Sequence, residues 1–320
     1  MLKTILFVLL VLIISTTAIG QEQTPEVTPE SNERSPRIAF TADVYRGADL
    51  EIFVLDLISY EFEIISPYVD VDYNPTFHPD GTQLAFNSTR ESNAQLGVTD
   101  IFIYDFATET LTNITNQREI TDIYPVWSYD GQSILFVSGE TSSIYRFDIA
   151  SGEIELVIER AANPSWFPDG EGFVFTTGRE GTVHIYSMQF NEEPMLLVGS
   201  DNYNAYDPHI SPDGMYLSYT LSASTDRVVL LNLETGEEQI LTDINLNFGY
   251  TAWSPDSQCL SYSPYASDNS NVLGNPDGIL LYDLRDSTTI ELPFEQDGVY
   301  GLTWTADATC DDLLAWASAQ

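Results

Sequence analysis

The chain has 320 residues, of which 49 are acidic and 11 are basic, and its formal net charge is −38. A surface this acidic repels the phosphates of nucleic acids and of anionic membranes, so the composition argues against both as partners. The 18 Tyr, 16 Phe and 5 Trp favour strands, and the length suffices for one large all-β domain.

The first twenty residues have the features of a secretory signal. Lys3 precedes an unbroken apolar run over residues 5–14, and the small residues Ala18 and Gly20 suit signal peptidase. This run is shorter than the roughly twenty apolar residues that span a bilayer. We therefore predict a signal peptide over residues 1–20, no integral membrane domain after its cleavage, and a secreted or periplasmic product. An uncleaved membrane anchor is the alternative.

Residues 21–35 are rich in Thr, Pro and Glu and have almost no apolar side chains. Such a segment cannot bury enough surface to fold by itself. We predict a disordered tether there, followed by a single domain over residues 36–320.

One short motif occurs six times in this domain. An apolar or aromatic residue is followed by Pro-Asp-Gly or a variant of it, which ends a strand in a tight turn: Pro fixes φ, Asp bonds its own backbone, and Gly accepts a positive φ. The Asp residues of successive copies are 39 to 51 residues apart, a period typical of four-stranded propeller blades. The copies are NPTFHPDG (74–81), YPVWSYDG (124–131), NPSWFPDG (163–170), DPHISPDG (207–214), TAWSPDS (251–257) and LTWTADA (302–308).

Short alternating apolar runs follow the motif and predict the remaining strands of each blade. Residues 37–40 match a second strand, so the first blade lacks an opening strand, and the missing strand is found at residues 302–304. We therefore predict an all-β, six-bladed β-propeller closed by pairing of the C-terminal strand with the N-terminal blade, which removes unpaired sheet edges. Residues 313–317 also have a second-strand pattern and compete with residues 38–40 for one place in the sheet.

Two cysteines occur, Cys259 and Cys310, and each follows a Trp by six residues. In an oxidising compartment a bridge between them would stabilise the fold by about 4 kcal/mol through loop entropy. Equivalent points on neighbouring blades, however, usually lie farther apart than the Cα limit of roughly 7 Å. The sequence leaves the bridged and the free state open.

The succession of this motif, a Leu-Ala-Phe-like strand and an Ile-Tyr-x-x-Asp-Leu-like strand resembles the WD-like repeat of the TolB-type six-bladed propellers, over about residues 36–304. The resemblance implies a fold rather than one activity, because propellers have many functions. TolB itself has an α/β domain before its propeller and works in envelope integrity with a peptidoglycan-associated lipoprotein. Here we expect only the tether in that place, so the same role is not implied. Prolyl-oligopeptidase-type enzymes join a similar propeller to a hydrolase domain, but this sequence has no Gly-x-Ser-x-Gly elbow.

Propellers bind ligands at the mouth of the central channel, near the loops that lead into the first strands. Tyr and Asp side chains around such a rim suit a peptide, a sugar or a cation. The simpler interpretation is that they pack and cap their own loops. The residues that we select at this mouth are Asp70, Asp72, Tyr73, Asp122, Tyr124, Asn163, Tyr206, Asp207, Tyr250 and Tyr300.

The arginines also gather at this face in the predicted fold. Because Arg suits bidentate capture of carboxylates, they indicate an acidic ligand; pairing with nearby Asp residues inside the protein is the alternative. Arg46, Arg90, Arg179 and Arg227 fall in or at loops between second and third strands, and Arg118 and Arg160 fall in loops before first strands.

The three histidines are dispersed. His78 and His209 lie in first-strand motifs, where His209 is expected to face the channel, and His184 begins a third strand. Metal-dependent pectate-fragment lyases resemble this type of propeller but gather several His around their metal, which this pattern does not support. We expect no cofactor, with Ca²⁺ bound by Asp residues of the mouth kept as an option although no EF-hand loop supports it.

These observations favour a secreted, monomeric, non-catalytic propeller that binds a peptide, protein or other ligand at the channel mouth, with association to the cell envelope as an option. The alternative is a carbohydrate-active enzyme, a lyase or glycosidase, that uses the same channel. Carboxylate pairs such as Asp70 and Asp72 would be its candidate groups.

Overall fold

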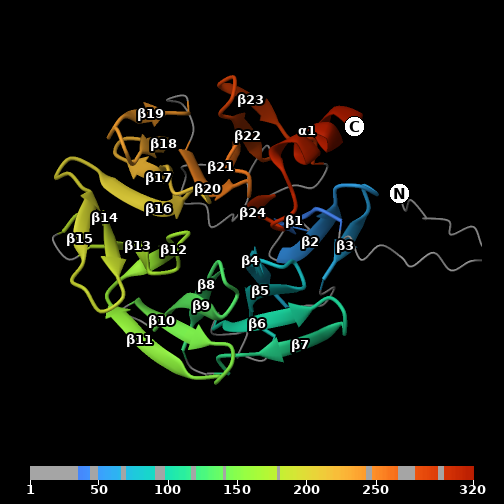
Figure 1. The fold of residues 1–320 in the computed structure, drawn as a ribbon, viewed down its shortest axis with the longest axis horizontal. Helices are drawn as coiled ribbons and strands as arrows, with labels where there is room; N and C mark the ends of the chain where they lie inside the picture. Colours follow the sequence, from blue (N-terminus) through green and yellow to red (C-terminus); the bar gives the residue numbers. More distant parts are fainter. Residues whose placement is uncertain are drawn as a thin grey trace, which may run out of the picture. The chain divides into compact units, whose positions relative to one another are not determined.

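The computed structural model describes residues 35–43, 50–65, 70–90, 98–116, 120–139, 142–178, 181–242, 247–265, 278–294 and 299–320. The predicted signal peptide and all but the last residue of the predicted tether lie outside this part of the chain. Within it, six sheets of four antiparallel strands surround a central axis, with the first strand of each sheet innermost (Figure 1). The predicted six-bladed, all-β propeller is confirmed.

The sheets are numbered here as blades in chain order. Blade 1 consists of β24 (Tyr300–Trp304), β1 (Arg37–Asp43), β2 (Leu50–Asp56) and β3 (Phe62–Ile64). Blade 2 consists of β4 (Asp72–Phe77), β5 (Gln83–Ser88), β6 (Asp100–Asp105) and β7 (Thr110–Asn113). Blade 3 consists of β8 (Asp122–Trp127), β9 (Ser133–Ser138), β10 (Ser143–Asp148) and β11 (Ile154–Glu159).

Blade 4 consists of β12 (Ala162–Trp166), β13 (Gly172–Thr177), β14 (His184–Gln189) and β15 (Met195–Val198). Blade 5 consists of β16 (Asn204–Ile210), β17 (Tyr216–Ser222), β18 (Asp226–Asn232) and β19 (Glu238–Ile240). Blade 6 consists of β20 (Asn247–Trp253), β21 (Cys259–Tyr265), β22 (Leu280–Asp283) and β23 (Thr288–Glu291).

The repeated motif forms the turn between the first and second strands. In blade 3, Asp130 accepts hydrogen bonds from the Ser128 hydroxyl at 2.6 Å and from the Gln132 amide at 3.0 Å, and Gly131 has a φ of 69°. The same arrangement recurs around Asp213, where Ser211 and the Met215 amide donate. The motif therefore closes a hairpin in both blades, and its Asp side chain is used to hold the turn.

Tryptophans of the motif join neighbouring blades. The indole nitrogen of Trp166 donates to the carbonyl oxygen of Val126 in the preceding blade, and that of Trp253 donates to the carbonyl oxygen of His209, each at 3.1 Å. The second strands between such contacts are almost entirely buried, as in β13. Apolar packing between blades and these directed hydrogen bonds together hold the sheets around the axis.

Pairing of β24 with β1 closes the ring. Ile38 lies opposite Trp304 in this pair of strands. The neighbouring residues Arg37 and Thr305 are joined by two hydrogen bonds: the Arg37 amide donates to the Thr305 hydroxyl at 2.8 Å, and the Thr305 amide donates to the Arg37 carbonyl at 2.9 Å. The predicted closure by the C-terminal strand is thus present, and β1 fills the second-strand position of blade 1.

The strand-like pattern at residues 313–317 is instead part of helix α1 (Cys310–Ala319), so that interpretation was wrong. Thr309 caps the helix and forms a capping box with Asp312, which satisfies amides that would otherwise be unpaired. Leu313 and Trp316 are buried on one helical face and pack on the apolar cluster of the closing blade. The apolar positions within residues 313–317 fit the period of a strand as well as that of a helix, and the capping box favours the helix.

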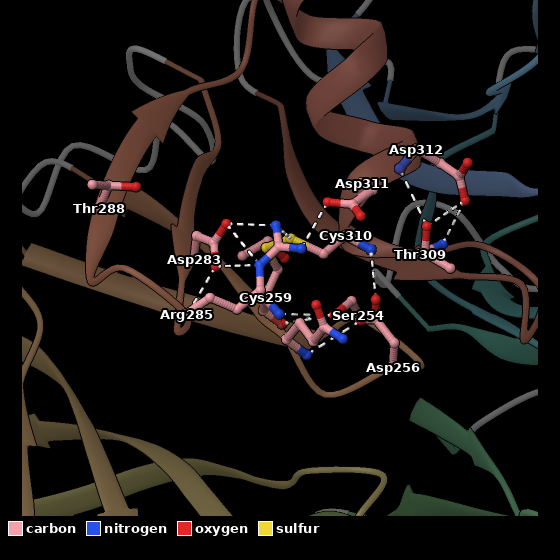
Figure 2. The surroundings of a disulfide bond; sticks show 12 residues. Ser254, Asp256, Cys259, Asp283, Arg285, Thr288, Thr309, Cys310, Asp311 and Asp312 are labelled. Atoms are coloured by element: carbon pink, nitrogen blue, oxygen red, sulfur yellow. Dashed lines mark hydrogen bonds and ion pairs between the residues drawn. A yellow bond between two sulfur atoms is a disulfide. The ribbon is translucent and has the colours of Figure 1, made fainter.

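Cys259 and Cys310 form a disulfide bond with a Cα separation of 5.4 Å (Figure 2). The expectation of too large a separation does not apply, because Cys310 begins α1 rather than occupying a second-strand position equivalent to that of Cys259. The Cys310 amide also donates to Asp256 at 3.1 Å, and Arg285 joins Asp283 to Asp311 beside the bond. The end of the chain is thereby fastened to blade 6, next to the strand that closes the ring.

We expect the double variant Cys259→Ala/Cys310→Ala to lose about 4 kcal/mol of unfolding free energy, because the bond closes a loop with a sequence separation of 51 residues in the unfolded chain. Urea unfolding followed by tryptophan fluorescence measures the loss. A reductant should lower the stability of the wild type by a similar amount and leave the double variant unchanged. Equal stability of the oxidised wild type and the variant would contradict this role.

Candidate functional site

The first strand of every blade carries the same backbone irregularity. The register between β4 and β5 shifts between Tyr73 and Thr76, and the residue at the shift, Asn74, has a φ of 55°. A positive φ is uncommon outside Gly and costs free energy, and such bulges redirect side chains. The equivalent residues form what we call the channel ring: Asn74 (φ 55°), Tyr124 (56°), Asn163 (50°), Asp207 (47°), Tyr250 (55°) and Gly301 (64°).

The channel ring lines a central cavity of about 500 Å³. Below the ring the wall is largely apolar and includes four of the five tryptophans: Trp127, Trp166, Trp253 and Trp304. Among the described residues of the wall there is no Lys or Arg, and the carboxylate and imidazole groups are those of Asp207 and His209. The cavity thus combines aromatic surface with hydrogen-bond acceptors.

Asp207 is held in place by the neighbouring ring position. Its Oδ1 accepts a hydrogen bond from Asn163 Nδ2 at 2.8 Å, and the Thr176 hydroxyl donates to Asn163 Oδ1 at 3.1 Å, which fixes the amide. Asp207 Oδ2 has no hydrogen-bond partner among the described residues. Burial, and then the charge of Asp226, raises the pKa of Asp207 to about 6, so the group is mostly ionised at neutral pH.

His209 lies two residues further along β16. Its Nδ1 is 3.2 Å from the Asp207 carbonyl oxygen and 3.0 Å from the Thr251 hydroxyl. Because a carbonyl oxygen can only accept, Nδ1 carries the proton and Nε2 keeps its lone pair. Burial lowers the pKa of His209 to about 4, so the imidazole is neutral at pH 7 and presents an acceptor.

Two cavity-lining tyrosines, Tyr124 and Tyr250, lie near the Asp207 carboxylate. Burial raises the pKa of Tyr124 and of Tyr250, and for both the charge of Asp207 is the next cause. The phenol of Tyr73 in turn contributes to the raised pKa of both. These hydroxyls therefore stay protonated at neutral pH, and the selected residues Tyr73, Tyr124, Asp207, His209 and Tyr250 form one cluster.

Other residues selected from the sequence lie elsewhere. Tyr206 lines a second cavity of about 320 Å³ together with Arg160. Asp122 is 0% exposed, and burial raises its pKa to about 6. Arg227 is the second residue of β18, and its Nε is buried without a hydrogen-bond partner among the described residues. Arg46, Arg118, Arg179 and the side chain of Tyr300 lie outside the described part of the chain.

Arg90 pairs inside the protein, which matches the alternative interpretation of the arginines. Its guanidinium forms an ion pair with Asp72, and the two side chains are 13% and 1% exposed. Arg90 Cζ also lies 5.5 Å and 5.3 Å from the ring centroids of Phe86 and Phe102. The pKa of Asp72 is raised, chiefly by burial, against the opposing effect of Arg90; the charge of nearby Asp70 adds to the increase. This pair stabilises the blade and leaves no charge for a ligand.

The ring positions Asn74 and Gly301 were not selected from the sequence. Both occupy the place in the motif that Tyr124 and Asp207 occupy, so the alignment of the copies contained the signal. The alignment does not indicate that these residues have a positive φ and line one cavity.

Groups that could hold a metal ion are scarce in the described residues. The one cluster of three suitable side chains is Cys259, Asp283 and Cys310, and its two sulfur atoms are bonded to each other. In the central cavity, Asp207 and His209 provide two donors, fewer than the three or four protein ligands that metal sites generally have. The geometry does not favour a metal centre here.

Residues 14–162 and 158–276 match the TolB beta propeller domain, and the chain belongs to this family. No match was found among the curated proteins. Within the described residues no helix is both long enough and apolar enough to cross a membrane.

Solved structures with related folds include TolB from Acinetobacter baumannii, with a TM-score of 0.68 and 21% identity over 84% of this chain and 66% of that chain. A putative TolB from Agrobacterium tumefaciens has a TM-score of 0.64 and 17% identity over 84% and 92% of the two chains. An oligogalacturonate lyase in complex with manganese has a TM-score of 0.52 and 16% identity over 81% and 74%. At these identities the likeness is one of fold, and this chain spans only 66% of the Acinetobacter protein.

Replacing Arg90 by Gln should lower the unfolding free energy by about 3 kcal/mol at pH 7, because Asp72 would remain buried without its counter-ion. The loss should shrink as the pH falls and Asp72 becomes protonated. Arg146→Gln is the matched control: its partner is Glu155, the two side chains are 35% and 57% exposed, and such pairs contribute less than about 1 kcal/mol. Equal effects in denaturant titrations would contradict the structural role of Arg90.

Asp207 and His209 should give opposite pH dependences of stability. The folded-state pKa of Asp207, about 6, lies above its ordinary 3.8, so Asp207 lowers stability as the pH rises through that interval. The folded-state pKa of His209, about 4, lies below its ordinary 6.5, so His209 lowers stability as the pH falls through that interval.

The unfolding free energy of Asp207→Asn should therefore increase relative to that of the wild type as the pH rises from about 4 to 6. The unfolding free energy of His209→Gln should instead increase relative to that of the wild type as the pH falls from about 6.5 to 4. Unfolding free energies of the three proteins across this range test the signs. Two difference curves with the same slope would show that these groups do not have the environments described.

Proposed function

We propose that this chain is a non-catalytic binding protein that takes a peptide, or an exposed segment of a protein, into the central channel. The observation that carries the proposal is the channel ring, in which five non-Gly residues keep a positive φ around a cavity of about 500 Å³. Backbone conformations of this kind cost free energy and persist only where the surrounding fold enforces them. They are found preferentially at ligand-binding and active sites. An extracytoplasmic location remains part of the proposal and rests on residues 1–20.

The character of the cavity wall supports a binding role. Aromatic and apolar surface with a few fixed polar groups is typical of ligand sites. The polar groups are already oriented, as Asp207 is by Asn163, so a ligand loses little free energy to ordering of the protein. The volume suits a few side chains or a chain end rather than a folded domain.

The enzymatic alternative, a lyase or glycosidase, has less support. Glycosidases generally use two carboxyl groups across the scissile bond, and the described wall of the cavity has one, that of Asp207. Asp207 and His209 remain the residues to change, and turnover of polysaccharide fragments that is lost in both alanine variants would overturn the binding-only proposal.

A channel-blocking variant tests the proposal. In Gly301→Tyr the new side chain would enter the channel, since the nearest atom to a Cβ at this position is Thr41 Oγ1 at 3.9 Å. Tyr124 and Tyr250 tolerate a φ of 56° and 55° at equivalent positions, so we expect the variant to fold at a cost of about 1 kcal/mol.

The matched control is Gly301→Asn, since Asn74 and Asn163 occupy two ring positions. Peptides selected from a random phage-displayed library on the wild type should bind Gly301→Tyr at least about tenfold more weakly, a loss of roughly 1.4 kcal/mol, and Gly301→Asn nearly as well as the wild type. Isothermal titration calorimetry measures both. Peptides that bind all three proteins equally, or no selected peptide at all, would contradict a channel site.

A further inference from the structure

We propose that the channel ring is a subsite for a protonated alkyl amine, with Asp207 Oδ2 and His209 Nε2 as hydrogen-bond acceptors and Tyr124 and Tyr250 beside the cation. This inference rests on the proposed peptide-binding function and names the group of the ligand that the ring recognises. The amine is either a lysine side chain or the amino terminus of a peptide.

The hydrogen-bond acceptors at the ring favour a ligand that only donates. Asp207 Oδ1 is occupied by Asn163, whereas Oδ2 has no partner among the described residues and belongs to a cavity-lining side chain. His209 adds an Nε2 lone pair, because Nδ1 faces the Asp207 carbonyl and the Thr251 hydroxyl. An ammonium group has three donors and no acceptor, and is the complement of such a pair.

The charge of the cavity wall favours a cationic ligand. The described wall of the cavity has the Asp207 carboxylate and no basic residue to neutralise it. Arg90, which the sequence suggested for ligand capture, is committed to Asp72. The whole chain has a net charge of −38, which attracts cations and repels carboxylate ligands. An amine would neutralise the partly buried carboxylate on binding, whereas an acidic peptide would add a second negative charge.

Aromatic side chains beside Asp207 also suit a cation with an alkyl chain. Tyr124 and Tyr250 lie close enough to the Asp207 carboxylate for its charge to act on their phenols, and both line the same cavity. Cations bind favourably over the faces of Tyr and Trp within roughly 6 Å of the ring centre. The alkyl part of an amine can then extend along the apolar wall at Trp253 and Leu302.

Small amines test the proposal directly. The probes are n-butylammonium, which mimics a lysine side chain, and glycinamide, which mimics a peptide amino terminus; n-butanol and butyrate are the neutral and anionic controls. Because four tryptophans line the cavity, their fluorescence reports binding. We expect one of the two amines to bind at least about tenfold more tightly than n-butanol and butyrate, and the better amine identifies the source of the group.

Asp207→Asn should weaken amine binding about tenfold or more, since the neutral amide keeps an acceptor for Asn163 but removes the charge. Asp201→Asn removes the same charge from an exposed residue outside the cavity wall and should leave binding unchanged. If Asp207→Asn does not fold, the preference of the wild type for amine over alcohol and carboxylate still decides the question.

Equal binding of amine and alcohol, preferential binding of butyrate, or amine binding unaffected in a folded Asp207→Asn protein would overturn the inference. Such a result leaves the proposed function intact if library peptides still bind the wild type and lose affinity for Gly301→Tyr. If those peptides also fail to bind in the channel, the proposed function fails as well.

Discussion

The pairing of β24 with β1 is the interaction on which the rest of the structure depends. It completes blade 1 with a strand from the other end of the domain, and hydrogen bonds between Arg37 and Thr305 extend it. β24 also supplies Gly301, the sixth position of the channel ring. The same strand therefore closes the fold and completes the cavity wall. Loss of β24 would leave an unpaired sheet edge in blade 1 and a gap in the channel ring.

The C-terminal features reinforce this pairing. Helix α1 covers the closing blade with Leu313 and Trp316, and the bond between Cys259 and Cys310 fastens its first residue to blade 6 (Figure 2). Stabilisation is thus concentrated where the ring is joined from distant parts of the chain. A firmly closed ring can in turn hold five non-Gly residues at positive φ and a partly buried carboxylate, each of which costs free energy.

Much of the fold follows from the sequence, because the repeated turn marks each blade and its period fixes the number of strands. The strand order, and the missing opening strand supplied by residues 302–304, could be derived in this way. Residues 313–317 could not, since five residues with two apolar periods fit a strand or a helix, and the deciding evidence was the capping pair Thr309 and Asp312.

The site was only partly predictable. Tyr124, Asp207 and Tyr250 were selected because they begin or precede the motif, and His209 because it lies within the motif and was expected to face the channel. All four do meet in the cavity. The ring as a whole was not predictable, because a positive φ at Asn74 or Tyr124 depends on the register with the second strand. The pairing of Arg90 with Asp72 likewise depends on burial, which a count of scarce arginines does not reveal.

Amide hydrogen exchange measured by mass spectrometry on the complex with a library-selected peptide tests the central claim, that the ligand occupies the channel ring. The account predicts slower exchange confined to the innermost strands β4, β8, β12, β16, β20 and β24, with unchanged exchange in the outer strands β3, β7, β11, β15, β19 and β23 (Figure 1). Protection of an outer strand with no change in the innermost strands would place the ligand outside the channel and contradict it.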